Sequence, residues 1–143
     1  MKQQLSRLIA DLALDAITLR RHDFERPRVD KAAVGLLVEE KERSFVVETD
    51  GEPGCFRVVG RLALGLMRSD ADGQPLPWTG QLWMEVEASY RSPRELPEPA
   101  ALQRFAETSG SVHLAAFQRQ YVAETLARAG LAVVWMPLRG VPS

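Results

Sequence analysis

The sequence predicts an α+β fold, in which an antiparallel sheet is flanked in sequence by an N-terminal and a C-terminal helix. Two runs with apolar residues at every second position, residues 55–68 and 81–91, indicate neighbouring strands. Apolar residues at helical spacing indicate amphipathic helices over residues 3–14 and 112–129. Strands grouped together between terminal helices are typical of an α+β domain rather than of alternating β–α units.

The first helix is predicted from an apolar stripe formed by Leu5, Leu8, Ile9 and Leu12. At about three turns, such a helix needs tertiary packing to persist. Residues 16–25 then have the pattern of an extended strand. We expect that strand to end before Pro27, because proline lacks a backbone donor and restricts the residue before it.

Residues 27–42 give no single clear pattern. Their apolar part, residues 34–40, suits either a short strand or a partly exposed crossover. A short strand is expected at residues 45–48, closed by the turn-forming residues 50–54.

The two alternating runs predict a hairpin with one buried face. In the first run the shared face carries Phe56, Val58, Leu62, Leu64 and Leu66. In the second run it carries Leu82, Met84, Val86, Ala88 and Tyr90. The turn-rich residues 69–80 join the two runs, which predicts an antiparallel pair.

The C-terminal part follows a Pro/Glu-rich connector, residues 92–101. The stripe of the last helix consists of Leu114, Phe117, Tyr121, Thr125 and Leu126. Gly130 stands where a helix C-cap is expected. The apolar run of residues 131–137 is stopped by Pro137.

Composition bounds the function. The 143 residues include 18 Lys+Arg and 19 Asp+Glu, a net charge of −1 that argues against a nucleic-acid binder with a basic surface. One cysteine and two histidines exclude an internal disulfide and a Cys/His zinc cluster. Asp11 and Asp15 interrupt the apolar start, so we expect neither a signal peptide nor a membrane span. A single cytoplasmic domain is expected.

Catalytic motifs are absent from the sequence, and we expect no enzymatic activity and no cofactor. His22 and Asp23 are neighbours on a strand and therefore point to opposite faces. We interpret His22 as a surface residue and His113, at the start of the last helix, as a packing or capping residue. Cys55 has no histidine close in sequence and is expected to be a buried, inert thiol.

Carboxylates and aromatic residues remain to be placed. Glu85 and Glu87 share a strand face with Trp83, and we expect their charges to be solvated. The chain also offers more apolar and aromatic residues than one sheet and one long helix need; these are Phe24, Leu36, Leu37, Phe45, Trp78, Trp83 and Trp135. Scattered singly they would be ordinary, but as a set they favour a partner surface. From the residues, we therefore infer a binding protein that forms a homo-oligomer.

Residues 102–137 resemble the closing segment of the SecB-like chaperone family. In that family a helix with a Leu, an aromatic and an Arg is followed by a glycine turn and an apolar stretch that ends in proline. The corresponding residues here are Leu114, Phe117, Arg119, Arg128, Gly130, Leu131 and Pro137. Residues 105–110 are similar to the element that leads into this helix in SecB-like proteins of toxin–antitoxin systems.

The resemblance implies a single SecB-like domain over residues 1–143, with a four-stranded antiparallel sheet and the helices on one face. It implies a dimer or tetramer that holds unfolded polypeptides in apolar grooves without ATP, for protein export or for a dedicated antitoxin client. The implied client groove consists of Phe24, Val34, Leu36, Leu37, Phe45 and Val47. Leu114, Phe117, Tyr121 and Leu126 are implied to pack on the sheet and at the subunit interface.

Partners follow from the same resemblance. The first strand carries Arg20 and Arg21, with Arg21 near the position where the family has an acidic residue for docking the SecA motor, which makes SecA a doubtful partner. We expect neither nucleic-acid binding nor membrane insertion. The alternative is a non-catalytic SecB-like scaffold that binds one folded partner. A small enzyme is the third hypothesis and has the least support, because two histidines and one cysteine do not supply a nucleophile–base pair or a metal set.

Overall fold

One four-stranded antiparallel sheet organises the protein, whose computed structural model describes residues 2–28 and 32–131. Its strands are β1 (Ala13–Glu25), β2 (Gly35–Glu48), β3 (Cys55–Ser69) and β4 (Pro75–Arg91). They lie in the order β1-β4-β3-β2, so β3 and β4 are central while β1 and β2 form the two edges.

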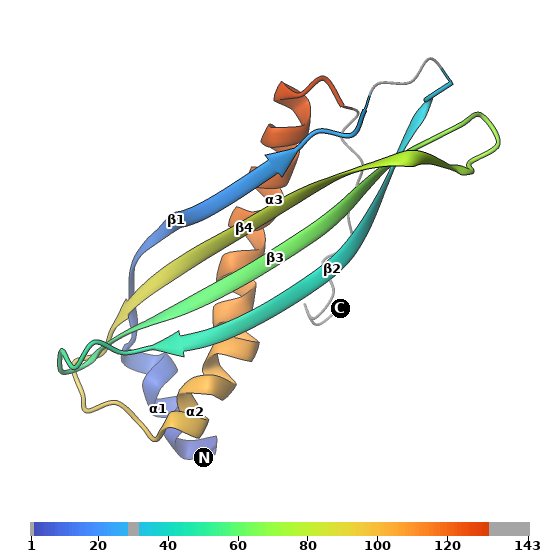
Figure 1. Ribbon diagram of the computed structural model, residues 1–143. Helices are drawn as coiled ribbons and strands as arrows, with labels where there is room; N and C mark the ends of the chain where they lie inside the picture. Colours follow the sequence, from blue (N-terminus) through green and yellow to red (C-terminus); the bar gives the residue numbers. More distant parts are fainter. Residues whose placement is uncertain (1, 29–31, 132–143) are drawn as a thin grey trace.

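The helices cover one face of this sheet. They are α1 (Lys2–Asp11), α2 (Pro99–Phe105), the π-turn η1 (Ala106–Gly110) and α3 (Ser111–Arg128). Figure 1 shows α3 running behind the sheet and crossing its strands at an angle, with α1 beside α2 at one end. The opposite face of the sheet, called the open face below, has no helix over it in the described part of the chain. The α+β class and the four-stranded sheet with its helices on one face are thus confirmed.

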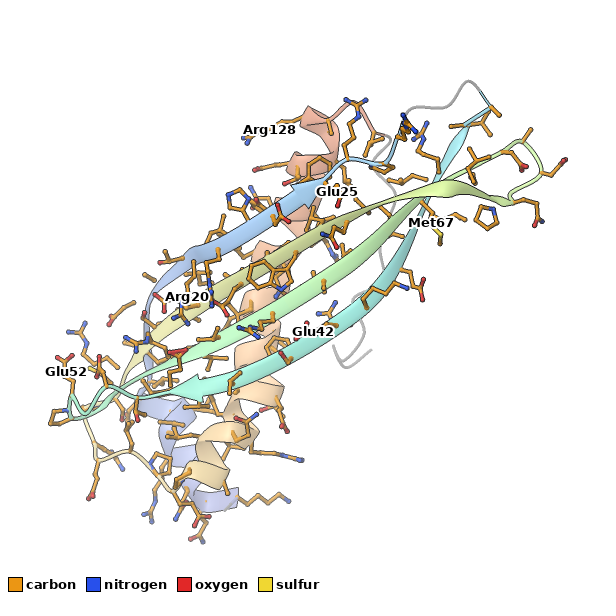
Figure 2. The ribbon with its side chains drawn as sticks, viewed as in Figure 1. Arg20, Glu25, Glu42, Glu52, Met67 and Arg128 are labelled. Carbon is orange, nitrogen blue, oxygen red and sulfur yellow. The ribbon has the colours of Figure 1, made fainter. Side chains whose placement is uncertain are left out.

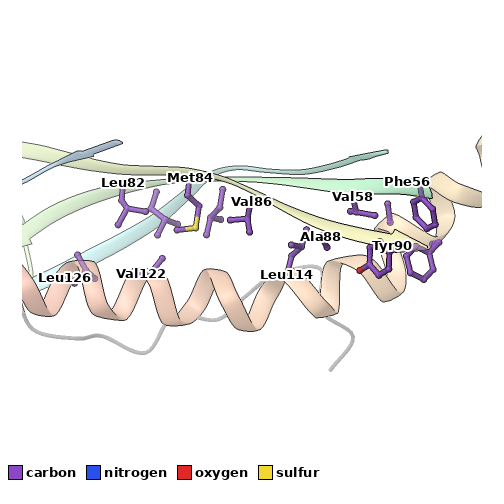
Figure 3. Close-up of a cluster of buried hydrophobic side chains, with 14 of the residues drawn as sticks. Phe56, Val58, Leu82, Met84, Val86, Ala88, Tyr90, Leu114, Val122 and Leu126 are labelled. Carbon is purple, nitrogen blue, oxygen red and sulfur yellow. The ribbon is translucent and has the colours of Figure 1, made fainter. Parts of the chain in front are cut away.

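The core lies between the sheet and the helices (Figure 3). Both predicted strand faces are confirmed: Phe56, Val58, Leu62, Leu64 and Leu66 of β3, and Leu82, Met84, Val86, Ala88 and Tyr90 of β4, are all buried. Phe56, Tyr90 and Phe105 form a cluster of aromatic rings at one end, with centroids 5.0–5.7 Å apart. The alternation of side chains in β3 and β4 therefore separates a dry face from the open face.

The helical stripe differs from the predicted one. Buried positions recur every fourth residue along α2, η1 and α3, at Leu102, Ala106, Gly110, Leu114, Gln118, Val122 and Leu126. Leu114 and Leu126 were predicted in the stripe and are buried, whereas Phe117, Tyr121 and Thr125 lie half-buried at its margin. The polar Gln118 occupies the centre of the interface instead.

The π-turn η1 keeps α2 and α3 in one continuous helical segment. A π-turn leaves carbonyl groups without their usual helical partners. Here the Thr108 hydroxyl donates to the Arg104 carbonyl at 2.8 Å, and the Ser111 hydroxyl donates to the Glu107 carbonyl at 2.9 Å. Gly110 lets this turn approach the sheet closely, since a Cβ there would lie 3.2 Å from Val58.

Several element boundaries shift from the sequence-based expectation. The ambiguous residues 34–40 and the short strand expected at 45–48 belong to one strand, β2. The loop expected over residues 69–80 shortens, because β4 already begins at Pro75. The C-cap of α3 is Ala129, and Gly130 is the residue after it: its φ is 74°, and the Leu131 amide donates to the Leu126 carbonyl at 2.9 Å. Residues 132–137 lie outside the described part.

Candidate functional site

The outer edge of the sheet at β2 carries exposed apolar side chains. Leu37 and Val46 project onto the open face and are 38% and 49% exposed. Val34, just before the strand, is 67% exposed. Phe45 and Val47 point to the helix side and are half-buried against the core. An edge strand with apolar residues on both faces is a natural place for another polypeptide to attach.

The structure does not bring all the residues predicted for a groove onto one surface. Phe24 lies on β1, at the opposite edge, three strand spacings or roughly 14 Å from β2. Leu36 is buried, with 6% of its surface exposed, and belongs to the core. Val34 and Leu37 lie at one end of β2, while Phe45 and Val47 lie near the other. Val46, an exposed residue of this edge, was not among the groove residues that the resemblance implied.

The middle of β2 is charged. A bulge between Glu40 and Glu42 interrupts its pairing with β3. On the helix side Arg43 donates through Nε to Glu40 at 2.7 Å, and only 9% of the Arg43 side chain is exposed. Its two terminal nitrogens are buried and have no hydrogen-bond partner among the described residues. Charges and a bulge at the centre of an edge strand reduce uncontrolled strand pairing, so they separate the two apolar ends of β2.

A second polar side chain is buried close to this strand. Gln118 of α3 is fully buried, and neither its amide oxygen nor its amide nitrogen has a partner in the part of the chain that the structure describes. It lies over Gly60 of β3, because a Cβ at Gly60 would be 3.3 Å from Gln118 Nε2. The same Cβ would lie 2.9 Å from Leu114 Cδ1 and 3.2 Å from Phe45 Cε1. The glycine thus provides the space that these three side chains fill.

The residues predicted for the helix and subunit interface divide into two groups. Leu114 and Leu126 are 0% and 1% exposed and pack on the sheet. Phe117 and Tyr121 are half-buried at the edge of the core, which leaves part of each ring accessible. Only the second pair therefore has surface to offer a neighbouring subunit.

The open face carries a network of ion pairs centred on Glu85. Contrary to the solvated carboxylate predicted from its strand position, Glu85 is only 2% exposed. It accepts hydrogen bonds from Arg61 Nε at 2.8 Å and Arg21 Nη2 at 3.0 Å, and Arg20 Nε lies 3.8 Å away. Burial by itself would raise the pKa of Glu85, but the Arg61 and Arg21 hydrogen bonds outweigh it and lower that pKa.

Arg20 extends the network across the sheet. Its Nη1 donates to Glu48 of the far edge strand at 2.8 Å, and its Nε lies 3.8 Å from Glu87. Figure 2 looks onto this face and labels Arg20 on the sheet. The four strands are therefore linked by charges of alternating sign, which neutralise one another locally.

A hollow of about 450 Å³ lies on the open face beyond this network. The small residues Ala63 and Gly65 form part of its lining, and Trp83, Lys41 and Asp23 are among the side chains around it. Lys41 is engaged with Glu39 at 2.9 Å. Arg21 lies 5.9 Å from the Trp83 ring, so this aromatic side chain is already in contact with a cation.

The histidines and the cysteine have structural surroundings. His22 is exposed and its ring lies 5.6 Å from that of Tyr121, while Asp23 pairs with Trp83 on the other face. His113 packs as predicted, with Nδ1 2.7 Å from the Tyr90 hydroxyl. Cys55 is half-buried rather than buried, and burial together with the Glu52 carboxylate raises the pKa of its thiol.

Metal sites and membrane-spanning helices are both absent from the described residues. Within residues 2–28 and 32–131, no group of three or more His, Cys, Asp or Glu side chains is arranged to hold a metal ion. Over the same ranges, no helix combines the length and the apolar character needed to span a membrane.

Comparisons with known proteins bear on the fold. No family model matches the sequence, and neither does any curated protein. Among solved structures, a SecB-like chaperone of Mycobacterium tuberculosis, in complex with a ChAD peptide from the HigA1 antitoxin, matches with a TM-score of 0.72. The two sequences are 21% identical, and the alignment covers 99% of each chain. The order of elements, the sheet topology and this match together identify the architecture of the chain as the SecB-like fold.

Proposed function

We propose that the protein is an ATP-independent chaperone that holds unfolded polypeptides along β2. The observation that carries the proposal is the set of exposed or half-buried apolar side chains along this edge strand: Val34, Leu37, Phe45, Val46 and Val47. The solved neighbour with the same fold is in complex with a peptide from an antitoxin, which supports a polypeptide as the ligand class.

The physical reason lies in what an unfolded chain exposes. Non-native segments present apolar side chains and unpaired backbone groups to water. An edge strand bears unpaired backbone groups of its own, and apolar residues on both of its faces bury client side chains without reading a sequence. In the proposed site, the core residue Leu36 and the distant Phe24 make no contact with the client.

We further infer that the protein acts as a cytoplasmic homo-oligomer. Phe117 and Tyr121 offer half-buried rings at the margin of α3. Leu14 and Val112, which are 42% and 47% exposed, add further apolar surface. A second subunit that covers such residues would remove apolar surface from water, and the mass in solution, measured by light scattering, tests for a dimer or tetramer.

An aggregation assay tests the proposal. Stoichiometric amounts of the protein should keep a denatured enzyme from aggregating on dilution, without ATP. Replacing Leu37 and Val46 together by serine should weaken holding about ten-fold, because it removes two apolar contacts from the client. Both side chains are exposed, so the melting temperature should stay nearly unchanged. Ile9→Ser, at a residue 48% exposed on α1, is the matched control and should hold clients normally.

The client range separates this function from a scaffold. Several unrelated unfolded proteins should compete for the same site, whereas a scaffold would bind one folded partner and ignore them. Addition of an antitoxin-derived or a precursor-derived peptide to the same competition distinguishes a dedicated client from general holding. Unchanged aggregation in the presence of the wild-type protein would refute the chaperone function.

A further inference from the structure

Among residues 2–28 and 32–131, Arg43 and Gln118 are buried side chains whose hydrogen-bonding groups lack partners. In Arg43, both terminal nitrogens of the guanidinium group lack a partner, although only 9% of the side chain is exposed. In Gln118, the oxygen and the nitrogen of the amide both lack one, at 0% exposure. A buried polar group without a partner destabilises a fold, so two such groups together call for a ligand or another compensating role.

The sheet register places the two side chains in one patch. Phe45 of β2 pairs with Gly60 of β3, and Arg43 pairs with Leu62, the next position on the same face. Gln118 lies over Gly60, in contact distance of the site where a Cβ would be, as does the ring of Phe45. The unpaired groups of Arg43 and Gln118 thus flank Phe45 at the seam between β2 and α3.

The chemistry of this patch matches a peptide backbone. Arg43 offers two N–H groups in a planar fork, and Gln118 offers one acceptor and one donor group, the complement of an amide. The positive charge of Arg43 is already balanced by Glu40 at 2.7 Å, which favours a neutral acceptor over a second carboxylate. The Phe45 carbonyl already accepts a hydrogen bond from Gln103 at 2.8 Å, so the acceptor left for a client N–H in this patch is the amide oxygen of Gln118.

We propose that Arg43 and Gln118 bind the backbone of an extended client segment, while Phe45 and Val47 contact its apolar side chains. The inference rests on the proposed chaperone function and adds a polar, sequence-independent contact to an apolar site. The client approaches from the outer edge of β2, which is unpaired in the described part of the chain. The half-buried ring of Phe45 turns aside when the client reaches Gln118.

Paired variants test this assignment. Arg43→Met and Gln118→Met keep the approximate length of each side chain and remove its hydrogen-bonding groups. The matched controls are Lys41→Met, at a lysine side chain 57% exposed on the same strand, and Gln120→Met, at an exposed position of the same helix. Affinity is measured by fluorescence anisotropy with labelled, reduced and carboxymethylated lactalbumin, a permanently unfolded protein. Thermal melts are recorded for every variant.

We expect Arg43→Met and Gln118→Met each to bind the unfolded protein about ten-fold more weakly, as the loss of hydrogen bonds predicts. Gln118→Met should not melt at a lower temperature, because an unpaired buried amide is replaced by an apolar group. Arg43→Met also removes the 2.7 Å ion pair with Glu40, so its binding and its melting temperature are compared with those of Glu40→Gln, which weakens the same pair and keeps the guanidinium group. The two controls should bind as the wild type does. Binding that falls only in proportion to a lowered melting temperature would indicate a structural role and overturn the inference.

A backbone-modified peptide supplies the second readout. A labelled twelve-residue peptide of alternating Leu and Ser is compared with an analogue that has ester bonds in place of alternate amides. Esters accept hydrogen bonds poorly and lack the N–H, so the analogue should bind the wild type more weakly and the Arg43→Met variant with little further loss. Equal discrimination by both proteins would overturn the inference and leave the chaperone function standing. Failure of the wild-type protein to bind any unfolded chain would refute the chaperone function itself.

Discussion

The space above Gly60 makes a double substitution informative. Gly60→Ala would place a Cβ 2.9 Å from Leu114 Cδ1, 3.2 Å from Phe45 Cε1 and 3.3 Å from Gln118 Nε2. A separation of 2.9 Å is closer than real Cβ contacts allow, so the packing must shift. Overpacking of this kind costs about 1–3 kcal/mol in the free energy of unfolding.

Leu114→Ala alters the same space in the opposite direction. The side chain is 0% exposed, and its truncation leaves a cavity that costs about 2–5 kcal/mol in the free energy of unfolding. In the double variant the new methyl group of residue 60 enters the volume that Leu114 has vacated. We therefore expect the double variant to be more stable than the sum of the single effects predicts, by about 1–2 kcal/mol.

Urea titration followed by far-UV circular dichroism at constant protein concentration measures all four proteins. The control pairs Gly60→Ala with Leu126→Ala, which is also buried but lies twelve residues, or roughly 18 Å, further along the helix. That pair should be additive within about 0.5 kcal/mol. Additivity in the Gly60–Leu114 pair as well would refute the packing described here.

Three further predictions concern the open face, the aromatic end of the core and the helix terminus. Glu85→Gln should lower stability at pH 7 and flatten its acid dependence in urea titrations, since Arg61 and Arg21 hold the pKa of Glu85 below its ordinary 4.5. That contribution is present above pH 4.5 and is lost as the pH falls through the lowered native value, so identical acid limbs would contradict it. Tyr90→Phe removes the 2.7 Å contact with His113 and should cost about 1 kcal/mol in thermal unfolding, while a neutral result would show that the contact contributes nothing. Gly130→Ala forces an alanine to φ 74° and should destabilise the protein by about 1 kcal/mol. Ala127→Gly, inside the helix, should lower the free energy of unfolding only by the difference in helix propensity between alanine and glycine.

The sheet was predictable from sequence because one face of β3 and β4 carries apolar residues at nearly every second position. β2 was not, since its centre is charged and bulged at Lys41, and local patterning gives no sign that residues 34–40 and 45–48 continue one another. Glu85 was misplaced for a related reason. Strand period assigned it correctly to the open face, but only the tertiary structure brings three arginines over it.

The helix illustrates a limit of the 3.6-residue template. Sequence periodicity selected Phe117 and Tyr121 as buried, yet the interface follows every fourth residue because α3 crosses a twisted sheet at an angle. Four residues overshoot one α-helical turn by about 40°, so the buried stripe winds around the helix. Gln118 is central to the candidate site and could not be found this way, since an amide in an apolar stripe gives no positive signal. The structure identifies it by its full burial and by its unpaired amide atoms.

The length of η1 also determines which side of α3 faces the sheet. Each residue of an α-helix turns the chain by about 100°, so deletion of one residue from Ala106–Gly110 would rotate all of α3 relative to α2. Leu114 and Gln118 would leave the sheet and their exposed neighbours would face it. A deletion in an exposed turn such as Asp70–Gln74 changes the structure locally, whereas a deletion in η1 would change which side of α3 faces the sheet. The number of residues between Phe105 and Gly130 is therefore as much a part of the fold as their identity.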